Sequence, residues 1–125
     1  MIECIIVGIG GFIGAVCRYL IGLIPLKEGS IFPIKTFIIN VLGCFIIGII
    51  AAFATKNNSF NPRIVLFLKV GICGGFTTFS SFALETSDLW KGGNTGISLL
   101  YIILSITVGV INVFAGQKFY FTFAT

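Results

Sequence analysis

The chain has 125 residues, of which 57% are hydrophobic and only 10% are charged. Its mean hydropathy is +1.11, and a water-soluble domain is typically about 45–50% apolar. These values exclude a soluble globular fold, so we expect a bilayer to surround most of the chain. The net charge is +4, but the eight basic residues are scattered. A nucleic-acid-binding protein would cluster them on one surface, so we expect no nucleic-acid partner.

The residue types also exclude most catalytic chemistry. There is no histidine, which removes His-ligated haem, His zinc sites and Ser-His triads. Paired carboxylates and an activated nucleophile are absent as well, so we expect no enzyme. Four cysteines lie among apolar residues without a C-x-x-C pair, and we expect them to be small buried hydrophobes: Cys4, Cys17, Cys44 and Cys73. The N-terminus has no basic segment typical of a signal peptide, so the first apolar segment is expected to stay as a membrane helix.

Four hydrophobic segments are each long enough to cross a hydrocarbon core of about 30 Å, which takes about 20 helical residues. The predicted spans are Cys4–Leu26, Thr36–Thr55, Ile64–Leu84 extending toward residue 90, and 95–117 within the uncharged stretch Gly92–Gln117. Short connections rich in Pro, Gly, Asn and Ser separate them. We therefore predict an all-α membrane protein with one four-helix domain over residues 1–125, placed in the cell (plasma) membrane as a multi-pass protein.

Four crossings place both termini on one side of the membrane, and the basic residues are almost evenly divided. One side carries Lys56, Arg63 and Lys118, with Lys69 near its helix end; the other carries Lys27, Lys35 and Lys91. Orientation normally follows such an imbalance in short loops. Two outcomes fit this near balance: insertion in both orientations, with an antiparallel dual-topology dimer, or a modest fixed orientation.

The first span carries a glycine-rich run and an arginine. The run imitates a nucleotide-binding loop, but its flanks are membrane helix, so Gly10 and Gly14 are interpreted as a close helix-packing pair. Arg18 lies inside the span, where a charge is costly and usually functional or paired. We favour a structural or vestibule role for Arg18 over direct pore lining.

Polar residues form stripes on the second and fourth spans. At helical spacing the second span presents Thr36, Asn40, Gly43 and Ile47, and the fourth presents Tyr101, Ser105, Gly109 and Asn112. The Asn40 amide either binds helices together or faces a passing anion. The fourth-span stripe likewise fits a path lining or a helix-packing face.

The third span contains the most unusual segment, Gly74–Phe82. Two adjacent glycines weaken a helix, and broken backbone at membrane depth is tolerated only against protein or a wet path. We therefore predict a break within this segment, at mid-membrane, that frees carbonyls suited to a hard cation. Phe79 and Phe82 follow with interleaved hydroxyls, and the positive edges of aromatic rings suit an anion.

Together these motifs resemble the Fluc family of fluoride channels, also called CrcB-type proteins. The resemblance covers the whole chain and depends on Gly10–Tyr19, Thr36–Asn40 and Gly74–Phe82. It implies a passive channel that exports fluoride from the cytoplasm, built as an antiparallel dimer with two pores. A second copy of the chain is the expected partner, with a paralogous subunit as the alternative.

The resemblance also assigns roles to residues. It implies a fluoride pore lined by Phe79, Phe82, Asn40, Ser80, Ser81, Tyr101, Ser105 and Glu85. It implies a vestibule role for Arg18 and a structural central sodium ion held by the backbone carbonyls of Gly74 and Thr77. The main alternative function is a small multidrug-type proton-coupled exporter. Such an exporter needs an acid deep in the first span, where this chain has only Glu3 at the mouth.

Overall fold

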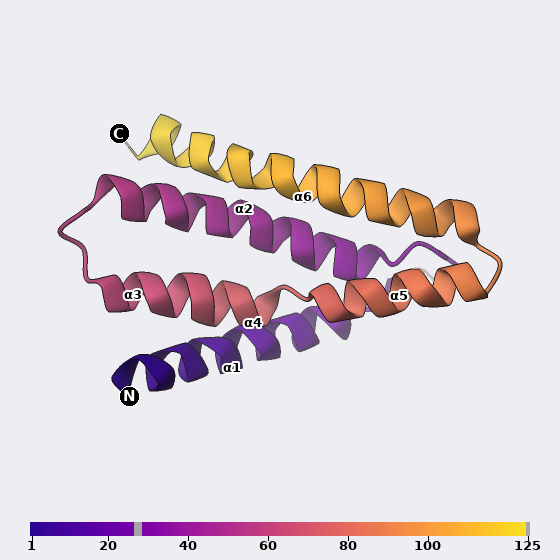
Figure 1. The fold of residues 1–125 in the computed structure, drawn as a ribbon, viewed down its shortest axis with the longest axis horizontal. Coiled ribbons are helices and arrows are strands. Elements are labelled where there is room, and N and C mark those ends of the chain that lie inside the picture. The colour runs from indigo at the N-terminus through magenta and orange to yellow at the C-terminus, as the bar shows by residue number, and fades with distance from the viewer. Residues whose placement is uncertain (27–28, 125) are drawn as a thin grey trace.

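The computed structural model describes residues 1–26 and 29–124. Within these ranges, four helical spans are long and apolar enough to cross a membrane. They are α1 (Ile2–Gly22), α2 (Ile34–Lys56), a broken third span over Pro62–Lys91, and α6 (Thr95–Phe123). Figure 1 shows that successive spans run in opposite directions, with both termini at the same end of the bundle. The predicted all-α fold with four spans is confirmed, whereas the Lys27 used in the charge comparison lies outside the described residues.

The observed spans differ from the predicted ones mainly in where they end. Helix α1 stops at Gly22 rather than Leu26, and the Lys35 ammonium donates a 2.8 Å hydrogen bond to the Gly22 carbonyl. A cation at this position satisfies a carbonyl that lacks a helical donor. Helix α6 continues past Lys118 to Phe123, because a lysine at the end of a span does not interrupt the helix and aromatic residues follow it.

The third span consists of four pieces. Helix α3 (Pro62–Leu66) begins at Asn61, whose side chain accepts a hydrogen bond from Arg63 N at 3.0 Å. A π-helical segment η1 (Phe67–Cys73) follows, then the single turn α4 (Gly74–Phe76), and then α5 (Phe79–Lys91). The predicted break of the third span is confirmed and lies within Gly74–Phe82. Gly74 is helical, with φ −63° and ψ −37°, and the extended residues are Thr77 and Thr78.

Gly71 and Gly75 of the third span stay helical because they pack directly on the backbone of α1. A Cβ added to Gly10 would meet the Gly71 Cα at 2.8 Å, and one added to Gly75 would overlap the Gly11 carbonyl. A Cβ on Gly14 would likewise overlap the Ile72 carbonyl. The predicted close packing of Gly10 and Gly14 is therefore confirmed, and it holds α1 against η1 and α4.

Helices α2 and α6 form the other tightly packed pair. A Cβ on Gly116 would overlap the Phe45 carbonyl, and one on Gly48 would overlap the Val113 carbonyl. In the fourth-span stripe, Gly109 is buried beside Cys44, as a helix-packing face requires, and the Asn112 amide bonds only the Val108 carbonyl of its own helix.

Few side chains are buried within one chain, as expected where lipid or another subunit covers the surface. Tyr101 is fully buried, while apolar residues along every span are exposed. The expectation for the cysteines holds for Cys73, which is buried, and is wrong for Cys4 and Cys17, which are exposed.

Candidate ion pathway

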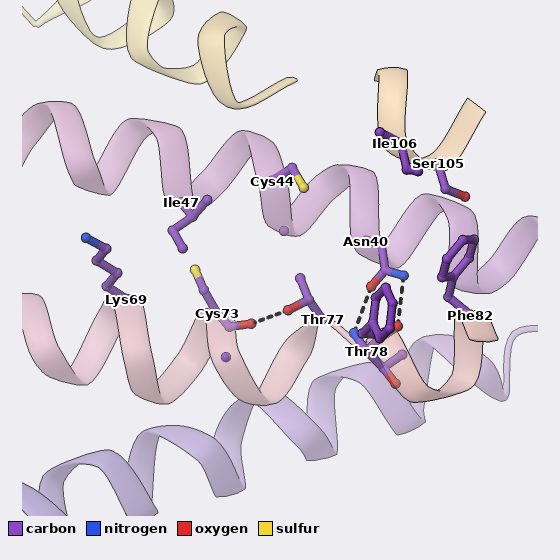
Figure 2. Close-up of a pocket in the computed structure, with 13 residues that line it drawn as sticks. Asn40, Cys44, Ile47, Lys69, Cys73, Thr77, Thr78, Phe82, Ser105 and Ile106 are labelled. Carbon is purple, nitrogen blue, oxygen red and sulfur yellow. Dashed lines mark hydrogen bonds between the residues drawn. The ribbon is translucent and has the colours of Figure 1, made fainter. Parts of the chain in front are cut away.

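The break in the third span is held by Asn40 of α2. Its side-chain Nδ2 donates to the Thr78 carbonyl at 3.1 Å, and its Oδ1 accepts from the Thr78 N–H at 2.8 Å. One amide therefore satisfies both backbone groups of an extended residue at membrane depth, as a neighbouring strand would. Figure 2 shows the two bonds side by side. Of the two roles considered for Asn40, binding helices together is the one seen in this chain.

Breaking the helix leaves carbonyls without their usual donors. In a continuous helix the Thr78 N–H would bond the Gly74 carbonyl, but it bonds Asn40 instead. The Ser81 N–H would bond the Thr77 carbonyl, but it bonds the Thr78 hydroxyl at 3.2 Å. The Gly75 carbonyl accepts from Arg18 Nε at 3.3 Å. The structure thus gives Arg18 a partner at the break and releases the carbonyls of Gly74 and Thr77 from helical bonding.

Helix α5 begins with a compact set of hydroxyls. The Thr78 side chain caps the helix at the Ser81 N–H and donates to Ser81 Oγ at 3.1 Å. Ser80 Oγ lies 3.4 Å from the same Thr78 oxygen and is exposed. These hydroxyls therefore fix the start of α5, and Ser80 lines none of the cavities described below.

An open cavity of about 330 Å³ lies between α2, α6 and the third span. We call it the ring cavity, since its walls include Asn40, Thr77, Phe79, Phe82 and Ser105. The Phe79 and Phe82 rings lie 5.6 Å apart between centroids at 53°. These two predicted pore residues are thus brought together with Asn40 and Ser105 around one space, and Figure 2 shows Asn40, Phe82 and Ser105 there.

The two phenylalanines have different surroundings. Phe82 packs edge-to-face on Tyr101, with centroids 5.0 Å apart, and Tyr101 packs in the same way on Phe32. Phe79 is 79% exposed. One ring is therefore fixed by its own chain, while the other projects toward whatever covers this face in the membrane.

Two buried hydroxyls near the rings make no hydrogen bond with the described residues: Tyr101 Oη and Ser105 Oγ. Thr36 and Glu85 lie near the Tyr101 hydroxyl but not in bonding geometry. A buried hydroxyl without a partner costs about 1–3 kcal/mol, and a native protein rarely retains one without a reason. Both groups are free to donate to a species inside the site.

The remaining predicted residues lie at the opposite side of the break. Arg18 and Ser81 line a second cavity of about 330 Å³ with Lys35 and Thr36, which we call the Arg18 cavity. Glu85 accepts a 2.6 Å hydrogen bond from Thr36 and lies at the wall of the neighbouring surface hollows. The predicted site residues therefore form two groups separated by Asn40 and the break.

Two residues of this arrangement were not among the predicted site residues. Thr36 holds the Glu85 carboxylate, and Thr78 links Asn40 to the α5 cap. Both have a sequence signal, because Thr36 lies one turn before Asn40 and Thr78 lies within the hydroxyl run. Lys69 also lines the ring cavity, although its place in the sequence suggested an interfacial anchor.

Relatives of known family match most of this chain. A family profile described as "CrcB-like protein, Camphor Resistance (CrcB)" matches residues 5–117. The chain belongs to the CrcB family. A CrcB-family protein of Azobacteroides pseudotrichonymphae, named fluoride-specific ion channel FluC, is 45% identical over 91% of this chain and 92% of its own length.

Two further CrcB-family relatives carry the same name. The protein of Ruminiclostridium cellulolyticum is 43% identical over 100% of this chain and 97% of its own length. That of Agrobacterium fabrum is 40% identical over 93% of this chain and 94% of its own length. The predicted resemblance is confirmed, and this CrcB protein is a multi-pass membrane protein and not an enzyme.

Proposed function

We propose that this CrcB protein is a passive, fluoride-selective channel that exports fluoride from the cytoplasm. Its relatives are named as fluoride-specific ion channels, which supports fluoride as the conducted ion. The observation that carries the mechanism is the pair of unpartnered hydroxyls, Tyr101 and Ser105, near the rings of Phe79 and Phe82.

A fluoride ion entering the ring cavity must replace its water shell with donors. Ser105 offers a free hydroxyl in the cavity wall, and Asn40 retains one amide N–H beyond the bond it makes to Thr78. The edges of the Phe79 and Phe82 rings carry partial positive charge and supply further contacts without a fixed cation. Several weak donors of this kind let an ion both enter and leave, as conduction requires.

An antiparallel dimer with two pores accounts for the exposed side of this arrangement. Phe79 is 79% exposed, and nothing lies within 4 Å of a Cβ added to Gly74. A second copy in the opposite orientation would cover both positions and close the open side of each cavity. The chain retains both phenylalanines, so we propose a homodimer; a paralogous partner is the alternative.

The released carbonyls fit the predicted structural sodium ion. Within residues 1–26 and 29–124, no three His, Cys, Asp or Glu side chains cluster, so a cation would depend on backbone oxygens. Gly74 and Thr77 offer two carbonyls, and a two-fold axis between subunits would supply two more. Bound there, sodium would offset the facing carbonyl dipoles and favour anions nearby.

The proton-coupled exporter has less support. The only acid of α1, Glu3, is exposed at the helix start and pairs with Arg63 at 3.4 Å. Glu85 lies near the far end of the third span, held by Thr36. Neither position gives an acid at the centre of the membrane.

Liposomes loaded with fluoride test the proposal directly. With a potassium ionophore to balance charge, purified protein should release fluoride to an external electrode, and chloride should leave far more slowly. Well-folded protein that releases fluoride no faster than empty liposomes would rule out a homodimeric channel.

Phe79→Ile and Phe82→Ile provide the matched variants for this experiment. Each removes a ring edge and retains apolar volume, so each should reduce fluoride efflux at least tenfold, about the effect of losing 1.4 kcal/mol of stabilisation. The elution volume of the assembly in detergent should not change. Full efflux from both variants would show that the two rings serve packing and not conduction.

A further inference from the structure

Lys69 is the only charged residue between Arg63 and Glu85 in the third span. It lies seven residues after Pro62, so at about 1.5 Å per residue it is about 10 Å along the helix. A charge at this depth is costly and by default has a role. Its side chain is nevertheless exposed, and it lines the ring cavity.

The register of the helix directs Lys69 into this cavity. Gly71 must face α1, because a Cβ there would lie 2.9 Å from the Gly10 Cα. Residues two apart on a helix point to nearly opposite sides, so Lys69 and Cys73 face away from α1. Both line the ring cavity. Figure 2 shows Lys69 at one end of this space, with Phe82 and Ser105 at the other.

No carboxylate of the described chain neutralises Lys69, since the ion pairs found there involve Arg63, Glu3 and the N-terminus. The other cavity walls add no charge, because α2 is uncharged between Lys35 and Lys56, and α6 before Lys118. Lys69 is thus the single fixed charge of the ring cavity, and Arg18 is a cation of the cavity beyond the break.

We propose that Lys69 is an anion-collecting residue at the mouth of the ring cavity, which raises the local fluoride concentration before the rings. The proposal depends on the proposed channel function. It adds a residue that sets the rate at which fluoride enters the ring cavity. Lys69 attracts the ion at long range and does not hold it, because an exposed ammonium keeps its own hydration. Arg18 gives the opposite mouth a cation as well, so the path carries positive charge at both ends.

The size of the effect follows from electrostatic steering. A cleft of one charge sign raises entry rates by about 10–10³, and the gain falls steeply with ionic strength. The Debye length is about 30 Å at 0.01 M salt and about 3 Å at 1 M. A role in steering should therefore be strong in dilute salt and nearly absent in concentrated salt.

The experiment measures fluoride efflux from liposomes in about 0.01 M and about 1 M of an impermeant potassium salt. The variants are Lys69→Met, Lys69→Gln and Lys69→Arg, and the wild-type rate tests the channel itself. Lys118→Met is the matched control, because Lys118 is an exposed lysine of α6 that lines no part of the ring cavity.

Lys69→Met and Lys69→Gln should lower efflux about tenfold in dilute salt and less than twofold in concentrated salt. Lys69→Arg and Lys118→Met should match the wild type in both. Equal efflux from Lys69→Gln and wild type in dilute salt would overturn the proposal. An equal loss at both salt concentrations would also overturn it, because that pattern indicates a structural role. A wild-type protein without efflux would instead contradict the channel function.

Discussion

At the scale of single residues, the Asn40 amide decides the shape of the third span. It presents one donor and one acceptor in the same plane, matched to the carbonyl and N–H of Thr78. A Ser or Thr hydroxyl donates and accepts through one oxygen, whereas the amide has its donor and its acceptor on two atoms that can bond the two backbone groups side by side. The extended conformation at Thr78 therefore depends on a residue 38 positions earlier.

Replacing Asn40 tests this dependence. Asn40→Ala leaves two backbone groups of Thr78 without partners, each worth about 1–3 kcal/mol, so we expect the variant to lose about 2–4 kcal/mol of stability and most fluoride efflux. Thermal unfolding in detergent measures the first and the liposome experiment the second. The control is Asn112→Ala, whose amide bonds only its own helix; it should lose less than about 1 kcal/mol. An equal loss in both variants would contradict the special role of Asn40.

At the scale of elements, the sequence predicted the four spans, the glycine packing of α1 and the existence of a break. It placed the break within Gly74–Phe82 but not at Thr77 and Thr78. Adjacent glycines weaken a helix in isolation, but Gly75 is held helical by its contact with Gly11, and the chain opens only where Asn40 competes for Thr78. Both deciding contacts come from other helices, so they cannot be predicted from the helix propensity of the local sequence. The split of Ser80 and Ser81 from the ring cavity was missed for the same reason.

Two glycines of α1 provide a paired test of the helix contact. Gly14→Ala would force a methyl group into the Ile72 carbonyl and should cost about 1–3 kcal/mol. Gly8 has nothing within 4 Å of an added Cβ, so Gly8→Ala should be neutral or stabilise the helix by up to about 1 kcal/mol. Thermal unfolding followed by the fluorescence of Trp90 compares them. A destabilised Gly8→Ala would show that another surface covers that face of α1.

At the scale of the whole molecule, one chain does not fully enclose the ring cavity. The ring cavity is open on one side, Phe79 projects from it, and the tightly packed pairs α1 with η1 and α2 with α6 are joined by fewer contacts. The proposed assembly of two chains would close the open side, and the near balance of basic residues would allow the copies to insert in opposite directions.

Cysteine labelling tests that orientation. The four native cysteines are replaced by alanine, and Ser59→Cys or Ser30→Cys marks one loop at each end of the bundle. In sealed right-side-out membrane vesicles, an impermeant maleimide should label about half of each variant if insertion is unbiased. Permeabilised vesicles give the full signal as a control. Complete labelling of one loop and none of the other would establish a single orientation.

The interruption of the third span also gives the centre of the molecule two electrical poles. The chain that enters the break ends in carbonyl oxygens and is the negative end of one helix dipole, while the chain that leaves it begins α5 with N–H groups and is the positive end of another. A continuous helix would cancel these ends against each other. Two extended residues, Thr77 and Thr78, are enough to separate them, so one short segment presents a surface suited to a cation and a surface suited to an anion without a charged side chain of its own.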